Sequence, residues 1–273
     1  MSQYIDEITE ALNEDVVLSQ MIRFPENIGE LNICIDRNRA LGGQLRGTLG
    51  YTDGTLVKII KPSIRNNRAG FIGRKSFASL NAMITCDRRM YVMNVNARFP
   101  GATFDSFVFQ GSALRTRMMQ LNEQQPCHLL GDAGYTLEPW MMTPFNRADR
   151  PLLDDSPEAR YNHAHASDRN VVERCIGALK GKFRCLHDER VLHYNYVKSG
   201  KFVNAACVIM NLGILGIPNY INEENLLNDN VNDALPEEDL FDDEDGGVRV
   251  HALLARGREI RNRIVQELEE MRN

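Results

Sequence analysis

The sequence lacks the features that mark membrane, exported and disulfide-bonded proteins. No stretch approaches the roughly 18 apolar residues of a membrane span, and the longest, 205–217, is interrupted by Asn211. The first residues show no charged-then-apolar signal pattern, so we expect no export. The six cysteines are scattered without a Cys-x-x-Cys pair, which predicts reduced core side chains rather than a zinc site. A composition of 43% hydrophobic and 25% charged residues excludes wholesale disorder.

Basic residues are missing from one segment of the chain. Residues 223–245 hold eleven acids and no Lys or Arg, which leaves 26 acids against 32 bases elsewhere, a net charge of about +6. A mildly basic body with an acidic segment is typical of enzymes that bind polyanions, although many proteins that never meet nucleic acid share it. The segment 218–247 is too polar to bury a core, so we expect a solvated linker there.

The spacing of apolar residues predicts a mixed α/β architecture. Residues 1–46 form an expected helical segment, and a domain over 47–217 follows. Within it the patterns predict strands at 49–59, 80–86, 91–97 and 127–131, and helices at 105–121, 167–185 and 198–215. Residues 248–273 form an expected amphipathic helix that packs on its own domain or on a twin subunit, so a homo-oligomer is one possibility.

Four acids lie where a carboxylate is costly or where ligand-binding groups gather. Asp53 shares a strand face with apolar residues, Asp132 ends a short buried strand, Glu173 lies beside a helical core stripe, and Asp105 opens a helix. Each has a plain alternative: Asp53 and Asp132 could be turn acids, Asp105 a helix cap, and Glu173 the ion-pair partner of Arg169. Together they suit hard divalent cations such as Mg²⁺ or Mn²⁺, and two such ions can assist phosphodiester hydrolysis.

Five motifs resemble those of the PIF/Harbinger transposase superfamily and its transposase-derived nucleases. They are GYTDGT at 50–55, RKSFASLN at 74–81, FPGATFDS at 99–106, GDAGY at 131–135 and the long block 161–186. The resemblance covers about three-fifths of the chain, from about Gly47 to Gly213. It implies a ribonuclease-H-like mixed sheet flanked by helices, and a DDE-type nuclease that uses two divalent ions, Mg²⁺ or Mn²⁺, to hydrolyse DNA.

The resemblance also implies roles for individual residues. The first Asp of the family falls on Asp53 and its Glu on Glu173, while Asp105 and Asp132 occupy the acidic positions between them. The strand order of ribonuclease-H folds favours Asp132 as the second catalytic acid and Asp105 as a fourth metal ligand. Six bases are candidate DNA contacts: Arg74, Lys75, Arg169, Lys180, Lys182 and Arg184. Ordinary solvated bases are the alternative.

The chain departs from the family pattern at three positions and near its start. Family members often carry His where Leu56, Ala78 and Phe104 stand here. The helix-turn-helix region that the family places upstream is reduced here to two short predicted helices. Two hypotheses follow: an active nuclease, or a domesticated DNA- or chromatin-associated module that has lost cleavage. The resemblance implies a nuclear protein that can also reside in the cytoplasm, with a separate Myb- or trihelix-like DNA-binding partner that supplies import and sequence specificity.

Overall fold

A five-stranded mixed sheet lies at the centre of the computed structural model, which describes residues 2–63, 68–73, 76–146, 153–216 and 246–271. The strand order is β3-β2-β1-β4-β5. β1 pairs antiparallel with β2 and parallel with β4, and the Asp87 hairpin joins β2 to β3 as predicted. The strands are β1 (Thr48–Lys58), β2 (Ser79–Cys86), β3 (Val92–Pro100), β4 (His128–Leu130) and β5 (Met141–Met142).

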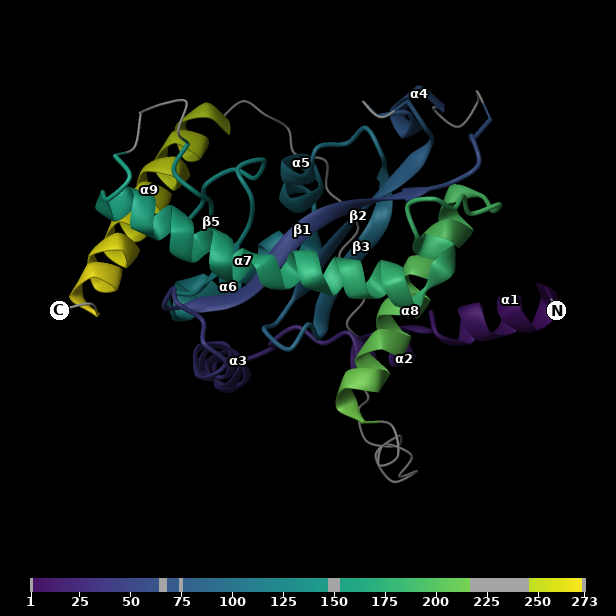
Figure 1. Ribbon diagram of the computed structural model, residues 1–273, viewed down its shortest axis with the longest axis horizontal. Coiled ribbons are helices and arrows are strands. Elements are labelled where there is room, and N and C mark those ends of the chain that lie inside the picture. The colour runs from purple at the N-terminus through teal and green to yellow at the C-terminus, as the bar shows by residue number, and fades with distance from the viewer. Residues whose placement is uncertain (1, 64–67, 74–75, 147–152, 217–245, 272–273) are drawn as a thin grey trace.

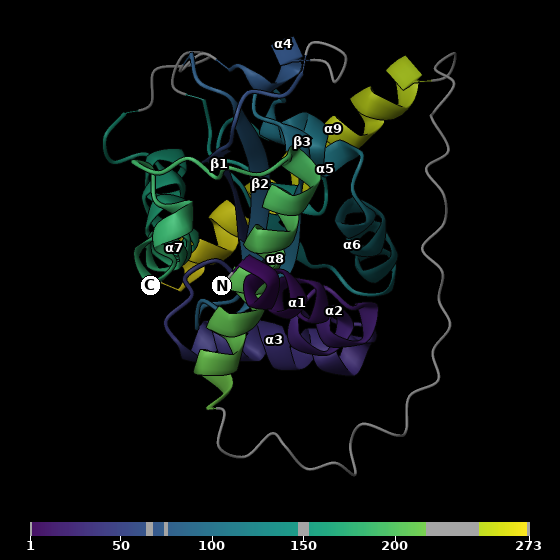
Figure 2. The same ribbon diagram turned by 90° about the vertical axis from the view of Figure 1, so that its right-hand side faces the viewer.

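Helices cover both faces of this sheet (Figures 1 and 2). The long helix α7 crosses β1 and β2, α8 packs on β3 and β2, and α3 and α5 lie against the other face. The helices are α1 (Ser2–Ala11), α2 (Asp15–Met21), α3 (Ile28–Ala40), α4 (Arg68–Phe71), α5 (Asp105–Gln110), α6 (Ala113–Gln124), α7 (Pro157–Lys182), α8 (Tyr196–Leu215) and α9 (Gly246–Glu270). This arrangement confirms the predicted mixed sheet flanked by helices.

The two faces of the sheet bury separate cores because strand side chains alternate. In β2, Leu80 and Ile84 point into the core beneath α7 and α8, whereas Met83 points into the core beneath α3, α5 and α6. All three side chains are 0% exposed. The same alternation decides which face of the sheet Asp53 of β1 lies on.

Two predicted helices have different limits in the structure. The helix expected at 105–121 is broken at Gly111, and Ser112 caps a new helix, α6, by accepting a hydrogen bond from the Arg115 amide at 3.2 Å. The helix expected to begin at 167 starts ten residues earlier, because Ser156 caps it and Pro157 fits its first turn. Strand β5, only two residues long, was not predicted.

Helix α9 packs on its own chain. Arg160 of α7 forms an ion pair with Glu269, and the Arg261 guanidinium lies 3.8 Å from the centre of the Phe145 ring. Ile264 and Val265 join the core beneath α7. Packing on the same domain, the first of the two predicted alternatives, is therefore observed. The predicted linker at 218–247 falls almost wholly outside the described residues. In the part of the chain that is described, no helix is both long and apolar enough to cross a membrane.

Candidate functional site

The open edge of β1 forms the centre of the candidate site. β4 is three residues long and its pairing with β1 ends where Leu130 meets Tyr51. β1 continues to Lys58, and the next backbone pairing on this side is the bridge between Ile59 and Leu192. Residues 53–57 therefore present one strand edge without a paired strand among the described residues, and this edge lies where β4 ends. Ends of neighbouring parallel strands are a common place for ligands in α/β sheets.

Asp53 lies on the α7 face of this edge. Its Oδ2 forms an ion pair with Arg169 Nη1 at 3.0 Å, and its Oδ1 accepts a hydrogen bond from the Gly54 amide at 3.0 Å. Its side chain is only 18% exposed. Burial raises the pKa of the Asp53 carboxyl; Arg169 opposes that rise, while the charges of Asp132 and Asp105 add to it. Burial is thus the main cost of ionising this carboxyl, and its acidic neighbours add to that cost.

Asp105 approaches the same strand from the opposite face. A Cβ placed on Gly54 would lie 2.1 Å from Asp105 Oδ1, so the carboxylate occupies the space that any other residue at 54 would fill. Its Oδ1 also accepts a hydrogen bond from Asn81 Nδ2 at 2.6 Å. Phe104, not Asp105, holds the cap position of α5, so the helix-cap alternative is not what the structure shows. Burial and the charge of Asp132 raise the pKa of Asp105.

Asp132 lies two residues beyond β4, in the turn that follows Gly131. Its Oδ1 accepts a hydrogen bond from the Gly134 amide at 2.8 Å, and the side chain is partly exposed. Its charge adds to the rise in the pKa of both Asp53 and Asp105. Tyr135, buried nearby, has a pKa raised by burial and by all three carboxylates. Three of the four predicted acids thus lie around the open edge of β1: Asp53 on the strand itself, Asp105 against Gly54, and Asp132 two residues beyond β4.

Glu173 joins the site through Arg169. It lies one turn after Arg169 on α7, is 55% exposed, and forms an ion pair with Arg169 Nη2 at 2.6 Å. Arg169 is itself only 16% exposed, so one guanidinium connects the acid of β1 to the acid of α7. The ion pair between Arg169 and Glu173, the alternative explanation of Glu173 given from the sequence, is thus observed. Among the described residues, no three His, Cys, Asp or Glu side chains lie close enough together to form a metal-holding group as they stand.

Of the other predicted DNA-contacting bases, three lie at or just after the end of α7, and two are not among the described residues. Arg74 and Lys75 fall in the part that is not described. Lys182 and Arg184 are exposed at the end of α7, whereas Lys180 is 15% exposed and donates a hydrogen bond to the Leu56 carbonyl at 3.2 Å. Lys180 lines a groove of about 320 Å³ beside the open edge, together with Gly54, Thr55, Leu56, Lys58, Phe77 and Asp188. The groove therefore begins at the residue that contacts Asp105.

Two residues important for the site were missed by sequence reasoning. Asn81 fixes Asp105, and the only signal was a polar residue in a buried strand. Asp168, which is 0% exposed, accepts hydrogen bonds from the amides of Gln44 and Leu45 and forms an ion pair with Arg88 at 2.8 Å. It fixes α7 to the segment that leads into β1, and so sets the position of Arg169 relative to Asp53.

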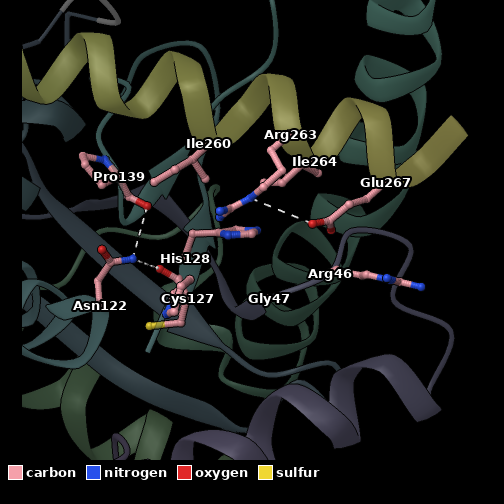
Figure 3. A pocket seen from close by; sticks show the side chains of 11 residues that line it. Arg46, Gly47, Asn122, Cys127, His128, Pro139, Ile260, Arg263, Ile264 and Glu267 are labelled. Atoms are coloured by element: carbon pink, nitrogen blue, oxygen red, sulfur yellow. Dashed lines mark hydrogen bonds and ion pairs between the residues drawn. The ribbon is translucent and has the colours of Figure 1, made fainter. Parts of the chain in front are cut away.

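A second cavity lies at the other end of β1, away from the acids (Figure 3). It holds about 120 Å³ between α9 and the start of β4, and its walls include Arg46, His128, Arg263 and Glu267. His128 is buried with Nε2 3.2 Å from Thr48 Oγ1, and burial lowers its pKa to about 3, so the ring stays neutral. This cavity lies at the interface between α9 and the sheet and is not part of the acidic site.

Comparison with known proteins assigns the chain to a family. The family described as DDE superfamily endonuclease matches residues 52–211, and the chain belongs to it. The mixed sheet is consistent with the ribonuclease-H-like fold of such endonucleases. All four acids of the predicted site lie within the matched range.

The relatives include named nucleases. The human protein named "Putative nuclease HARBI1" is 33% identical over 215 residues, which cover 78% of this chain and 58% of that protein. Its Xenopus laevis counterpart is 31% identical over 215 residues, covering 78% and 59%. Protein ALP1-like of Arabidopsis thaliana is 24% identical over 152 residues, covering 50% and 36%. The chain thus spans less than two thirds of the length of these relatives, and no solved structure matches it.

Proposed function

We propose that the chain is a divalent-metal-dependent DNA endonuclease in which Asp53, Asp132 and Glu173 hold the ions. Asp105 supplies a fourth carboxylate from the opposite face of β1. The observation that supports this proposal is that three carboxylates lie around one open strand edge: Asp53 on β1, Asp105 against Gly54, and Asp132 two residues beyond β4. Asp132 follows the strand next to β1, which supports it over Asp105 as the second catalytic acid.

The residues fit hard divalent cations. Carboxylate oxygens are the ligands that Mg²⁺ and Mn²⁺ prefer, and burial raises the pKa of both Asp53 and Asp105, with the charge of Asp132 adding to each rise. A bound cation would lower the cost of ionising both. Arg169 already supplies a positive charge between Asp53 and Glu173. We therefore infer that Arg169 must release one of these two carboxylates when a divalent ion binds.

The protein residues have distinct tasks in such a reaction. The ions, when bound, would activate water and stabilise the leaving oxygen of a phosphodiester. Asn81 holds Asp105 in place, and Gly54 lets it approach the strand. Lys180 donates a hydrogen bond to the Leu56 carbonyl and forms an ion pair with Asp188, so a substrate phosphate at Lys180 would have to displace Asp188. No side-chain nucleophile is required in such a reaction.

A domesticated module without cleavage is the second candidate, and one observation favours it. Arg169 already joins the first and last acids of the triad at 3.0 and 2.6 Å, an arrangement that can be stable without any ion. In that case the fold would serve to bind DNA or a partner protein, and divalent ions would leave both its stability and its DNA unchanged.

A plasmid assay separates the two candidates. Supercoiled DNA is incubated with the chain in Mg²⁺, Mn²⁺ or EDTA, beside Asp53→Asn, Glu173→Gln and the matched control Glu123→Gln, an exposed acid of α6. The nuclease predicts nicking with Mg²⁺ or Mn²⁺ that both site variants lose by at least a hundredfold and the control retains. Equal nicking by wild type and Glu173→Gln would identify a contaminant, and DNA binding without metal-dependent nicking would support the module.

We further propose that sequence specificity and nuclear entry come from a Myb- or trihelix-like partner protein. Specificity needs an element that reads base edges in a groove, and the apolar helices α1 and α2 pack towards α8 instead. The isolated chain should therefore bind DNA weakly and without sequence preference. Selection from random duplexes tests this directly, since a single tight consensus obtained with this chain alone would contradict it.

A further inference from the structure

Helix α1 turns its apolar side to solvent. Tyr4, Ile5 and Ile8 are 70%, 42% and 58% exposed. Their spacing of three to four residues places them on one side of the helix, and Ala11, also exposed, extends that side by one turn. We call Tyr4, Ile5, Ile8 and Ala11 the apolar stripe. On a helix at the surface of a globular protein, such a stripe usually faces the core of its own domain.

The polar side of α1 makes the contacts with the rest of the chain. Asp6 forms an ion pair with Lys198 of α8 at 2.7 Å, and Glu10 forms one with Lys201, one turn further along both helices. Thr9, on the same side of α1, is only 4% exposed. The polar side therefore lies against α8, and the apolar stripe points away from it. This orientation is the reverse of ordinary amphipathic packing.

Contacts at the end of α1 fix this orientation. The Asn13 side chain donates a hydrogen bond to the Lys201 carbonyl at 2.9 Å and accepts one from the Asn204 side chain at 3.0 Å. The same part of α8 is anchored in the core by Val203 and Cys207, both 0% exposed. The apolar stripe thus belongs to a helix that is held in place, so a partner would meet a surface that is already formed.

The charge beside the apolar stripe is negative. Residues 1–22 hold five acids and no Lys or Arg. Two of these acids, Asp6 and Glu10, are neutralised by the lysines of α8. Glu7, in contrast, is exposed beside the stripe, and Glu14 is exposed just beyond its end. The surface therefore combines exposed apolar side chains with a net negative charge.

This charge decides between the possible occupants of the stripe. DNA and anionic lipid surfaces attract bases, and residues 1–22 supply none. Two copies of the chain packed α1 against α1 would bring acids of the same helix together, which is unfavourable. An amphipathic helix with Lys or Arg beside its own apolar side complements both the apolar side chains and the acids.

We propose that the apolar stripe of α1 is the docking site for a basic amphipathic helix of a partner protein. Apolar side chains of that helix pack on Tyr4, Ile5 and Ile8, and its Lys or Arg side chains meet Glu7. The inference goes beyond the proposed nuclease and does not rest on it, since α1 lies outside residues 52–211, which match the endonuclease family.

Synthetic helical peptides test the docking site. Fluorescence anisotropy with the full chain measures the affinity of three labelled peptides: an amphipathic helix of Leu and Lys, the same composition in scrambled order, and the amphipathic helix with Glu in place of Lys. The variants of the chain are Tyr4→Gln, Ile8→Gln and Glu7→Lys. One matched control is Val250→Gln, at a 56% exposed residue of α9, which lies at the other end of the molecule (Figure 1). The other is Glu123→Lys, at an exposed acid of α6.

The scrambled peptide measures binding through charge alone, including any binding to the acidic segment 223–245. We expect the helix of Leu and Lys to bind about tenfold more tightly than either other peptide. Tyr4→Gln and Ile8→Gln should each weaken that helix by about tenfold, as loss of an anchor does at an interface, and leave the scrambled peptide unchanged. Glu7→Lys should weaken it by about threefold at low salt and by less at high salt. Both controls should match wild type.

Equal binding of the Leu–Lys helix by wild type, Tyr4→Gln and Ile8→Gln would overturn the inference, as would a Glu peptide that binds as tightly as the Lys peptide. Sedimentation of the chain alone tests the second copy, because a dimer that Ile8→Gln dissociates would mean that the stripe joins two copies instead. Binding to anionic lipid vesicles that Ile8→Gln abolishes would likewise assign the stripe to a membrane surface. None of these measurements involves DNA, so a chain that fails to nick plasmid DNA would reject the proposed nuclease and leave this inference standing.

Discussion

Arg169 joins Asp53 to Glu173, with its two terminal nitrogens 3.0 and 2.6 Å from the two carboxylates. The three residues come from β1 and α7, and buried Asp168, next to Arg169 in sequence, fixes the helix to the segment before β1. One guanidinium thus balances charge at a site where the acids repel one another. This relationship predicts competition between Arg169 and divalent ions.

Divalent ions should raise the thermal stability of the chain. An ion that binds only the folded state adds about 2.7 kcal/mol at one hundred times its Kd. We expect millimolar Mn²⁺ to raise Tm relative to EDTA, and Asp53→Asn to abolish the shift. Arg169→Gln should lower Tm in EDTA and enlarge the Mn²⁺ shift, while Arg258→Gln, at an exposed base of α9, should change neither. Identical melting curves in EDTA and Mn²⁺ would remove the support for a metal site.

The raised pKa of Asp105 predicts a stability that depends on pH. Burial and the charge of Asp132 make ionisation of this carboxyl harder in the fold than in the unfolded chain. Its contribution to stability is therefore fully present below the ordinary pKa of an aspartate and is lost as pH rises through the higher pKa of the folded state. Asp105→Asn should raise Tm at pH 7 by a few degrees, on the order of 2 °C, and the gain should vanish near pH 3.5.

The control for this effect is Asp154→Asn, at an exposed acid near the start of α7. Melting curves of both variants from pH 3.5 to 8 give the comparison. An Asp105→Asn variant that is less stable than wild type at pH 7 would show that the hydrogen bond from Asn81 outweighs the cost of burial.

Gly54 should tolerate no side chain. A Cβ there would lie 2.1 Å from Asp105 Oδ1, so Gly54→Ala must displace the carboxylate or the helix that carries it. We expect a loss of about 1–3 kcal/mol in unfolding free energy, as in overpacked cores, together with loss of metal-dependent nicking. Gly177→Ala is the matched control, because a Cβ on that exposed residue of α7 meets nothing within 4 Å. It should stabilise the chain by about 0.5–1 kcal/mol.

Asp168 should prove structural rather than catalytic. It is 0% exposed and binds two amides and Arg88, so Asp168→Asn leaves the partly buried Arg88 guanidinium without its counter-charge. Breaking a buried ion pair costs about 3–5 kcal/mol. Urea unfolding measures this, and Asp53→Asn, which should keep the fold, is the comparison. A loss below about 1 kcal/mol would mean that the amides of Gln44 and Leu45 find other acceptors.

The sequence predicted the acids of the site better than their geometry. Asp53 drew attention because a carboxylate beside apolar strand residues is costly, Asp132 because it follows the end of a buried strand, and Asp105 because it opens a helix. Their arrangement could not, since it depends on β4 ending after three residues and leaving the edge of β1 open. No periodicity in the sequence states where the pairing of two strands stops.

Residues that support the site only by contacting other residues, and residues that set the ends of helices, gave the weakest signals in the sequence. Asn81 lies between apolar residues of β2 and gives no sign of its bond to an acid 24 positions away. The start of α7 was missed because the prediction began from the apolar stripe near Glu173, although Ser156 and Pro157 form an ordinary helix start. The break at Gly111 was missed for the opposite reason: apolar spacing continues across it, and only the Ser112 cap reveals it.

The acidic segment should weaken DNA binding through charge. Residues 223–245 carry eleven acids beside a body of net charge about +6, so they compete with phosphates for the same bases. Deletion of the segment should tighten binding of a short duplex at 50 mM salt, by on the order of tenfold, and the gain should fade by 300 mM because salt screens exposed charges. A variant with Asn and Gln in place of the acids keeps the length of the segment and should behave like the deletion. If only the deletion tightens binding, the segment obstructs DNA by its bulk; if neither does, its charge acts on something other than DNA.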